Sequence, residues 1–314
     1  MATKIEWTDE TWNPLVGCSR ISEGCDHCYA IGTVHRGLAP QHRGLTVHVK
    51  GQGTDWNGTV RLAEHRLDEP PLRRTKPTRW FVNSLSDLFH PAVDDDTIAR
   101  IFAVMAMAEQ HTFQVLTKRP KRMAQLLGTD SWWEDVAAAT CEFGDADNQT
   151  IWRVGADGSS VGLPNVWLGT SIELDKYSWR ADHLRATPAA VRFISAEPLL
   201  GPLRSLDLTS IDWLIVGGES GPGARPMHPQ WVRQLRDWCT EAGYESGGPQ
   251  GWVSTPVAFF FKQWGDWAPS DSSDAPWVSG GGGSAAHRVE RVGKAAAGRD
   301  LDGRTWDEFP GGGS

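Results

Sequence analysis

Short apolar runs that end in polar residues and alternate with helical patterns constrain the fold of this chain more than any other feature. Six such runs occur, at residues 79–82, 112–116, 165–168, 191–194, 213–216 and 257–261. Continuous apolar runs are typical of strands that are covered on both faces, as in parallel sheets. Helical spacing at 98–109 and 229–242 follows two of these runs, which favours βα units. The sequence therefore predicts an α/β protein with a complete or partial β/α barrel, and a doubly wound sheet is the alternative.

Segments that lack this alternation indicate how the chain is organised. A seventh strand is expected at 11–16, just before the first cysteine. The barrel is predicted to cover residues 1–267, with irregular insertions near 35–78 and 141–164. A Gly/Ser-rich linker at 279–286 lies in the remaining segment, 268–314, which is expected to be a linker and a C-terminal extension.

Composition and charge exclude some classes of protein. No run approaches the roughly 20 apolar residues that span a bilayer, and the polar N-terminus does not resemble a secretory signal. A cytoplasmic protein without a membrane segment is therefore expected. The formal net charge of −8 argues against broad, sequence-independent binding to nucleic acid. A local basic groove stays open, so nucleic acid is an uncertain partner.

Three of the five cysteines, Cys18, Cys25 and Cys28, lie close together in a C-x6-C-x2-C pattern. In a cytoplasmic chain such a group is more typical of a metal site than of disulfides. Three thiolates can bind three irons of a [4Fe-4S] cluster and leave the fourth iron open to an exogenous ligand. In radical enzymes that ligand is S-adenosylmethionine (SAM), which the cluster cleaves to start hydrogen abstraction.

Zinc is the alternative metal that the same cysteines would bind. Three thiolates and a histidine such as His27 or His35 would complete a tetrahedral site. Structural zinc sites commonly use paired CxxC motifs, and this segment has one. Spacing alone leaves both metals open, and inert thiols are the third alternative. Cys141 and Cys239 are expected to be unrelated, and Cys239 lies in an amphipathic helical pattern that suggests a core position.

Charged and polar residues lie where the predicted strands end, and we predict that they line a shared pocket, because barrel active sites form at that face. The simpler alternative is that strands end in polar turns. Glu197 and Lys262 are the predicted catalytic residues. A structural carboxylate paired with an arginine is an equal alternative for Glu197. The predicted cofactor-binding residues are Asn83, Ser84, Lys118, Ser171, Glu173, Gly217, Gly218 and Glu219.

Each of these assignments has a structural alternative. Gly217 and Gly218 would let backbone approach SAM, but a glycine pair after a strand is also a common tight turn. Lys118 and Arg119 would bind a carboxylate or phosphate, or form a solvated turn. The segment from Asn83 to Asp87 would contact SAM hydroxyls, or cap a helix.

Motifs along nearly the whole chain resemble the phage gene-product-37/68 family, whose members share a three-cysteine domain of unknown function. The matching segments are 4–8, 11–14, the cysteine run, 81–89, 116–120, 195–201, 217–221, 260–265 and 301–306. The resemblance implies a phage or bacterial iron–sulfur enzyme similar to radical SAM enzymes, and a three-Cys-motif partner protein. The chain departs from the usual C-x3-C-x2-C spacing, and His27 stands where an aromatic residue is common.

The sequence thus predicts a radical SAM-like enzyme with a [4Fe-4S] cluster and SAM as cofactors. Its substrate is not indicated by any motif, and family context alone suggests a nucleotide or a nucleic-acid base. Two other functions stay open. One is a zinc-stabilised binding protein that acts with a partner protein, and the other is a metal-dependent nuclease or hydrolase that uses the strand-end carboxylates.

Overall fold

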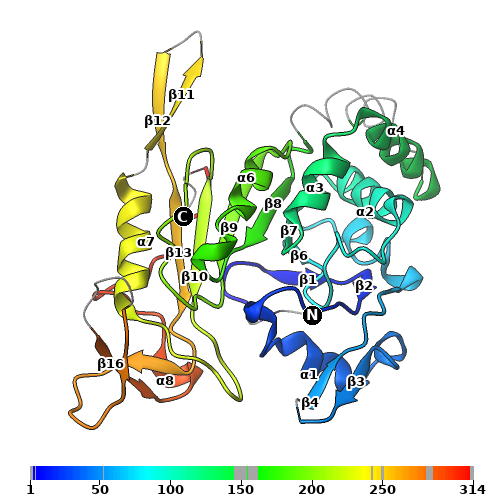
Figure 1. Cartoon of the computed structure of the whole chain (residues 1–314). Helices are drawn as coiled ribbons and strands as arrows, with labels where there is room; N and C mark the ends of the chain where they lie inside the picture. The colour runs from blue at the N-terminus through cyan, green and yellow to red at the C-terminus, as the bar shows by residue number, and fades with distance from the viewer. Residues whose placement is uncertain are drawn as a thin grey trace. The chain divides into compact units, whose positions relative to one another are not determined.

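The computed structural model describes residues 3, 5–51, 53–144, 154, 162–241, 243–248, 251–280 and 286–311 (Figure 1). The chain divides into two compact units. The first unit consists of Met1–Ile21, Cys28–Thr170 and His183–Val191, and the second of Ser22–His27, Ser171–Asp182 and Arg192–Ser314. The sequence-based boundary between residues 267 and 268 stays a prediction.

The main sheet contains seven strands in the order β1-β6-β7-β8-β9-β10-β13, which is also their order along the chain. The strands are β1 (Glu10–Trp12), β6 (Arg79–Val82), β7 (Thr112–Thr117), β8 (Val166–Ser171), β9 (Val191–Ala196), β10 (Trp213–Gly217) and β13 (Ala258–Gln263). Within each unit the neighbouring strands pair in parallel. A doubly wound sheet reverses its strand order at a switch point, whereas a β/α barrel keeps it. The predicted α/β class is therefore confirmed, and the strand order is that of a partial β/α barrel.

All six strands predicted from apolar runs are present, but the seventh is divided. The expected strand at 11–16 forms β1 and a separate short strand, β2 (Leu15–Val16). Pro14 stands between them, and proline has no N–H to donate to a ladder. β2 leaves the main sheet and pairs antiparallel with β5 (Arg61–Leu62). The chain is thereby redirected just before Cys18.

Three helices of the first unit pack together beside β6 and β7, as Figure 1 shows: α2 (Asp95–Met107), α3 (Pro120–Leu127) and α4 (Asp130–Ala139). The Asp94 side chain caps α2 by accepting a hydrogen bond from the Thr97 amide. Phe102 of α2 contacts Trp132 and Trp133 of α4, with ring centroids 5.2 and 5.8 Å apart. None of the helices in the described ranges is long and apolar enough to cross a membrane.

The predicted insertion at 35–78 is an elaborated loop with short elements. After α1 (Tyr29–His35), a hairpin of β3 (Thr46–Val49) and β4 (Gly53–Trp56) packs against that helix. Three short 3-10 helices complete it: η2 (Pro40–His42), η3 (Glu64–Arg66) and η4 (Pro71–Arg73). Most of the second predicted insertion, after η5 (Thr140–Glu142), lies outside the described residues, as do positions 281–285 of the predicted linker.

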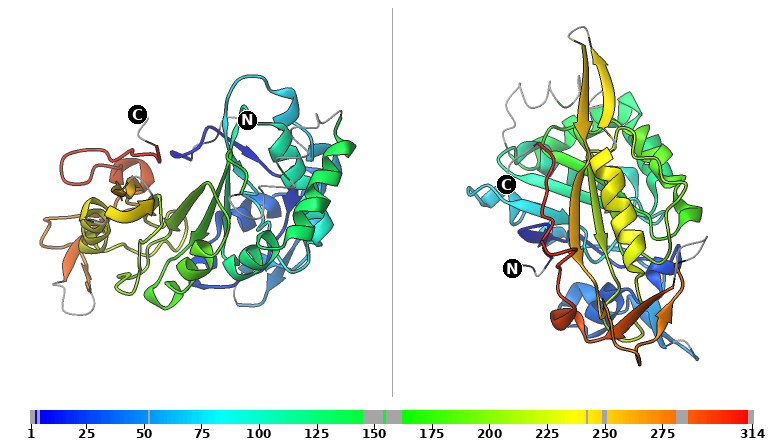
Figure 2. Two further views of the ribbon diagram at one scale, coloured as in Figure 1. Left: turned by 90° about the horizontal axis from the view of Figure 1, so that it is seen from above. Right: turned by 90° about the vertical axis from the view of Figure 1, so that its left-hand side faces the viewer.

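The second unit surrounds β9, β10 and β13 with one long helix and small antiparallel sheets. α7 (Pro229–Glu241) contacts β13 (Figure 2) and confirms the helix predicted at 229–242. The unit also contains η6 (Asp175–Tyr177), the hairpin β11 (Gly243–Gly248) with β12 (Gly251–Pro256), the sheet of β14 (Trp267–Pro269), β16 (His287–Arg291) and β15 (Trp277–Val278), and α8 (Lys294–Ala297). Of α6 (Arg180–Arg185), the part up to Asp182 belongs to this unit.

The C-terminal segment, whose role the sequence did not indicate, covers β13. The Phe261 amide donates to the carbonyl of Trp306, with N and O 2.9 Å apart. The Phe259 amide donates to the Glu308 carboxylate at the same distance. Because β13 is the last strand of the sheet, these contacts satisfy backbone groups that an open edge would expose.

Candidate functional site

A glycine with an unusual backbone conformation positions Cys18 directly after β2. Gly17 has φ +103°, and its amide donates to the Leu85 carbonyl with N and O 3.1 Å apart. A Cβ atom on Gly17 would lie 2.2 Å from the carbonyl oxygen of Thr59. Only glycine fits both the conformation and the space. The chain therefore brings Cys18 beside the loop that follows β6.

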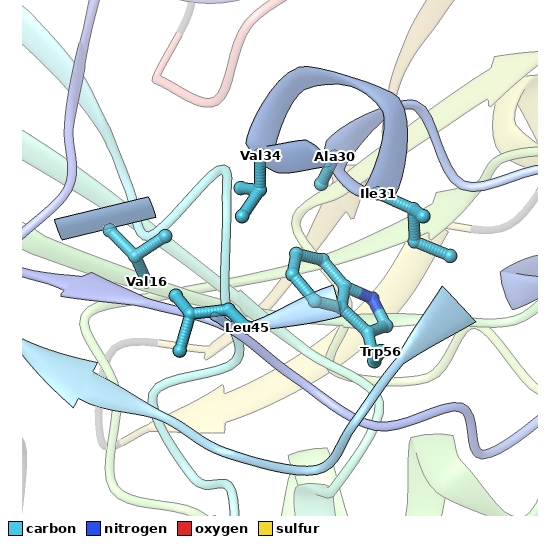
Figure 3. Packing of buried hydrophobic residues seen from close by; sticks show 6 residues of the cluster. All are labelled: Val16, Ala30, Ile31, Val34, Leu45 and Trp56. Atoms are coloured by element: carbon cyan, nitrogen blue, oxygen red, sulfur yellow. The ribbon is translucent and has the colours of Figure 1, made fainter. Parts of the chain in front are cut away.

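Cys18 and Cys28 are partly buried against the same apolar cluster of the first unit. Figure 3 shows its six residues, which are Val16, Ala30, Ile31, Val34, Leu45 and Trp56. Cys28 occupies the N-cap position of α1, and its carbonyl accepts from the Ile31 amide at 3.2 Å. Neither cysteine forms a disulfide. Two of the three predicted metal ligands thus share one apolar wall, which limits the access of water.

Polar residues from the loops after β6 and β7 also surround Cys18. Arg119 Nη1 lies 3.9 Å from Cys18 Sγ and 2.8 Å from Asp87 Oδ2. Burial and the Asp87 carboxylate raise the pKa of the Cys18 thiol to about 12, and Arg119 opposes this rise. Metal binding would have to displace the thiol proton, because the thiolate is the ligand.

Cys25 ends the 3-10 helix η1 (Glu23–Cys25), and residues of the second unit hold the segment around it. The Gly24 amide lies 3.4 Å from Glu173 Oε1, and His27 Nδ1 lies 2.9 Å from Glu219 Oε2. Arg225 Nη2 donates to the Glu23 carbonyl at 2.9 Å. The Glu23 carboxylate also bonds Lys176 and Tyr177. Both sides of Cys25 are therefore anchored.

Glu173, a predicted cofactor ligand, is fully buried beside Arg180. Glu173 Oε2 and Arg180 Nη1 lie 3.0 Å apart, and the same Nη1 donates to the carbonyl of Ser171 at 2.8 Å. Two charges that are buried in this way are stabilised by each other and by protein hydrogen bonds, because water cannot reach them. The structure gives Glu173 a positioning role toward Gly24, and the cofactor contacts of Ser171 and Glu173 stay predictions.

Glu219, another predicted cofactor ligand, lies in a similar environment. Arg225 donates to both of its carboxylate oxygens, at 2.6 Å from Nη2 and 2.9 Å from Nε. Burial favours a higher pKa for Glu219, but the hydrogen bonds from Arg225 and His27 outweigh it and lower that pKa below its usual value. Glu219 is therefore ionised and its oxygens are already engaged.

The two predicted catalytic residues form an ion pair. Lys262 Nζ in β13 lies 2.8 Å from Glu197 Oε1, just after β9. Gly217, at the end of the intervening strand β10, makes room for this pair, because a Cβ there would lie 2.7 Å from Glu197 Oε1. Ser195 Oγ donates to the other Glu197 oxygen at 3.3 Å. Glu197 thus forms an ion pair, as its structural alternative requires, but its partner is a lysine and not the expected arginine.

Gly218 permits a close backbone contact. A Cβ atom on Gly218 would fall 1.9 Å from the carbonyl oxygen of Trp264. The Gly218 amide donates to the Gln263 carbonyl at 2.9 Å. This geometry favours the tight-packing alternative for the glycine pair, and its contact with a cofactor stays a prediction.

The first-unit residues predicted to bind a cofactor are brought together near the end of β6. Asn83 has φ +61°, its Oδ1 accepts from the Leu15 amide at 3.2 Å, and its buried Nδ2 has no partner among the residues that the structure describes. Ser84 Oγ donates to Asn13 Oδ1 at 3.1 Å, and its carbonyl accepts from Tyr29. The Lys118 amide donates to Asp87 Oδ2 at 3.1 Å. Asn83 Nδ2 is thus a buried donor that a bound molecule could use.

Two arginines of the site were not among the predicted residues. Arg180 and Arg225 neutralise Glu173 and Glu219, which precede them by seven and six residues. Both arginines follow a strand-end glutamate closely in the sequence. That spacing is the feature from which the two ion pairs could have been predicted. Sequence alone did not show which arginine would turn back to that glutamate.

The two metals that the spacing left open both stay predictions. Among the described residues, no three His, Cys, Asp or Glu side chains are placed to hold one metal ion. Zinc needs all its ligands around a single ion, whereas each cysteine of a cubane cluster binds a different iron. His27 bonds Glu219, and His35 bonds Thr46 Oγ1 at 3.2 Å. The two histidines named as zinc ligands thus have other partners, a set of three thiolates fits a cluster with one open iron, and the identity of the metal stays a prediction.

An open pocket of about 430 Å³ lies in the second unit, over the loops that follow β8 and β9. Its lining residues are Leu174, Asp175, Lys176, Gly201, Pro202 and Arg204. The volume is in the range of small-molecule sites. Lys176 also bonds Glu23, so the pocket adjoins the anchored Cys25 segment.

Comparison with known proteins identifies a family but not an activity. The family model described as "Protein of unknown function (DUF5131)" matches residues 2–310. No curated protein and no solved structure matches the chain significantly. The family description names no substrate or cofactor.

Proposed function

The chain belongs to the DUF5131 family of proteins of unknown function, and on that premise we propose that it is a radical SAM-like iron–sulfur enzyme. Cys18, Cys25 and Cys28 would hold a [4Fe-4S] cluster and leave one iron for SAM. When bound, the cluster would supply the electron that cleaves SAM to a 5′-deoxyadenosyl radical. The substrate class that fits the family context is a nucleotide or a nucleic-acid base.

One observation carries this proposal: a segment with three cysteines that form no disulfide follows β1, the first strand of a parallel sheet whose order is that of a partial barrel. The other two cysteines lie elsewhere, Cys141 exposed in η5 and Cys239 buried in α7. Burial raises the pKa of Cys239, as expected for a core thiol. A set of three thiolates is what a cluster with one open iron requires.

The surroundings of the cysteines support the same proposal. The apolar cluster beside Cys18 and Cys28 excludes water from one side of these thiols. Arg119 places positive charge next to Cys18, where thiolate ligands and a cluster would add negative charge. The anchored Cys25 segment keeps the middle thiol from moving freely.

We assign roles in this proposal to three further predicted residues, Asn83, Glu197 and Lys262. The unpartnered Asn83 amide is a donor for SAM or substrate, as buried donors seek acceptors. In the Glu197–Lys262 pair, a carboxylate and an ammonium group lie in contact, and these are groups that can accept and donate a proton. We assign the three-Cys-motif protein as its partner on the resemblance described above.

The test is the metal content of anaerobically purified protein. We expect about four iron and four sulfide per chain in the unaltered protein and in Cys141→Ala. Cys18→Ala, Cys25→Ala and Cys28→Ala should each lose most of this content. Stoichiometric zinc without sulfide would overturn the proposal in favour of a zinc-stabilised binding protein. Metal-dependent hydrolysis that persists in Cys18→Ala would favour the nuclease or hydrolase instead.

A further inference from the structure

The guanidinium group of Arg119 connects Cys18 to a buried carboxylate of the same unit. Its Nη1 contacts both Cys18 Sγ, at 3.9 Å, and Asp87 Oδ2, at 2.8 Å. Its Nη2 donates to the carbonyl oxygen of Ser19 at 3.1 Å and to Ser19 Oγ at 3.0 Å. Only 9% of the Arg119 side chain and 8% of the Asp87 side chain is exposed. The pair is therefore shielded from the solvent that would otherwise weaken its effect on Cys18.

Asp87 cannot turn away from Arg119, because its other lone pairs are occupied. Asp87 Oδ1 accepts from Thr117 Oγ1 at 2.7 Å and from the Phe89 amide at 3.0 Å. Asp87 Oδ2 also accepts from the Lys118 amide at 3.1 Å. The carboxylate is thus fixed by residues after both β6 and β7, and it fixes the guanidinium in turn.

The Cys18 side of the guanidinium is also fixed. Ser19 Oγ lies 2.8 Å from His90 Nε2, so the acceptor that Arg119 bonds is itself held. The Arg119 amide donates to Thr117 Oγ1 at 2.9 Å, which fixes the backbone from which the side chain extends. The result is a rigid donor aimed at the sulfur atom of Cys18.

We propose that Arg119 is a positioning residue that orients Cys18 and raises the reduction potential of the cluster bound there. This inference rests on the function proposed above. Hydrogen bonds to ligand sulfur and nearby positive charge both favour the reduced cluster, which carries one more negative charge. Because the Asp87 carboxylate partly offsets the guanidinium charge, the two residues should act on the potential in opposite directions.

Lysine is not an equivalent residue at this position. A guanidinium presents five donors in a planar fork, whereas an ammonium is a compact point charge. Arg119 uses that fork to contact a carboxylate, a sulfur, a carbonyl and a hydroxyl at once. Arg119→Lys therefore keeps the charge and loses the geometry, and Arg119→Gln loses both.

The experiment is an EPR-monitored redox titration of the full chain, reconstituted with iron and sulfide and without SAM. We expect the midpoint potential to move to more negative values in Arg119→Gln and to move less in Arg119→Lys. It should move to more positive values in Asp87→Asn. Arg100→Gln is the matched control, because Arg100 pairs with Glu64 and Glu142 and not with Asp87. The midpoint potential of the cluster in this variant should equal that of the unaltered protein.

Three results would overturn the inference. The first is an unchanged potential in Arg119→Gln with full iron and sulfide content, and the second is a shift of the same sign in Arg119→Gln and Asp87→Asn. The third is loss of the cluster in every Arg119 and Asp87 variant while Arg100→Gln keeps it, because Arg119 would then only hold the loop. Absence of a cluster from the unaltered protein would instead refute the proposed function.

Discussion

Glu173 and Arg180 form an ion pair that is almost completely excluded from solvent, with Oε2 and Nη1 3.0 Å apart and side-chain exposures of 0% and 1%. The other carboxylate oxygen of Glu173 accepts from the amide of Gly24, the residue before Cys25. One buried pair thus connects the end of β8 to the segment that carries the middle cysteine.

Removal of Glu173 should be among the most destabilising single substitutions in the second unit. Glu173→Ala leaves the Arg180 charge buried without its partner, and breaking such a pair costs about 3–5 kcal/mol in the free energy of unfolding. Urea denaturation of the metal-free protein measures this. Arg73→Ala is the control, because the Arg73–Glu69 pair is exposed and should contribute under about 1 kcal/mol. Equal losses in the two variants would show that the buried pair has no special role in stability.

Gly217→Ala should disrupt the Glu197–Lys262 pair. The new methyl group would lie 2.7 Å from Glu197 Oε1, so the carboxylate must shift away from Lys262, at a cost of up to about 1 kcal/mol in the free energy of unfolding. Gly32→Ala is the matched control, since no atom lies within 4 Å of its added methyl group. Because Gly32 lies inside α1, that substitution should stabilise by up to about 1 kcal/mol. The interpretation fails if both substitutions change stability in the same direction and by the same amount.

The N-cap of α2 should make stability depend on pH in the acid range. The hydrogen bond from the Thr97 amide lowers the pKa of Asp94 below its usual value. A lowered pKa in the folded state means that the ionised carboxylate stabilises the protein above the unfolded pKa of about 3.9. That contribution is lost as the pH falls through the folded pKa.

Asp94→Ala should therefore lower the free energy of unfolding by about 1 kcal/mol at pH 7. The difference in this free energy between the variant and the unaltered protein should become smaller as the pH falls below about 4. Denaturation curves at pH 7 and at pH 3 measure both values. Asp271→Ala, at an exposed position, provides the control and should change stability little at either pH. A difference for Asp94→Ala that is independent of pH would contradict the assigned role of the ionised cap.

Much of the sheet could be predicted because buried parallel strands are continuous apolar runs, which the sequence shows directly. Local patterns also predicted α2 and α7, since both have a clear helical period. The prediction of one continuous strand at 11–16 was wrong, because Pro14 separates β1 from β2. The proline was visible in the sequence, but its consequence depends on which edge of the strand is paired.

The contacts of the candidate site could not be predicted in the same way. Arg119 and Cys18 are 101 residues apart, and His27 and Glu219 are 192 residues apart. Such pairs depend on how the loops after the strands fold, and no local period encodes that. Strand-end position did select Glu197 and Lys262, which the structure pairs, but it did not show that they would neutralise each other.

The most direct test of the proposed function is cleavage of SAM. The anaerobically reconstituted chain is incubated with dithionite and SAM, and 5′-deoxyadenosine is measured. We expect this product from the unaltered protein and from Cys141→Ala, and none from Cys25→Ala. A full cluster in the unaltered protein without any 5′-deoxyadenosine would contradict the proposed radical chemistry.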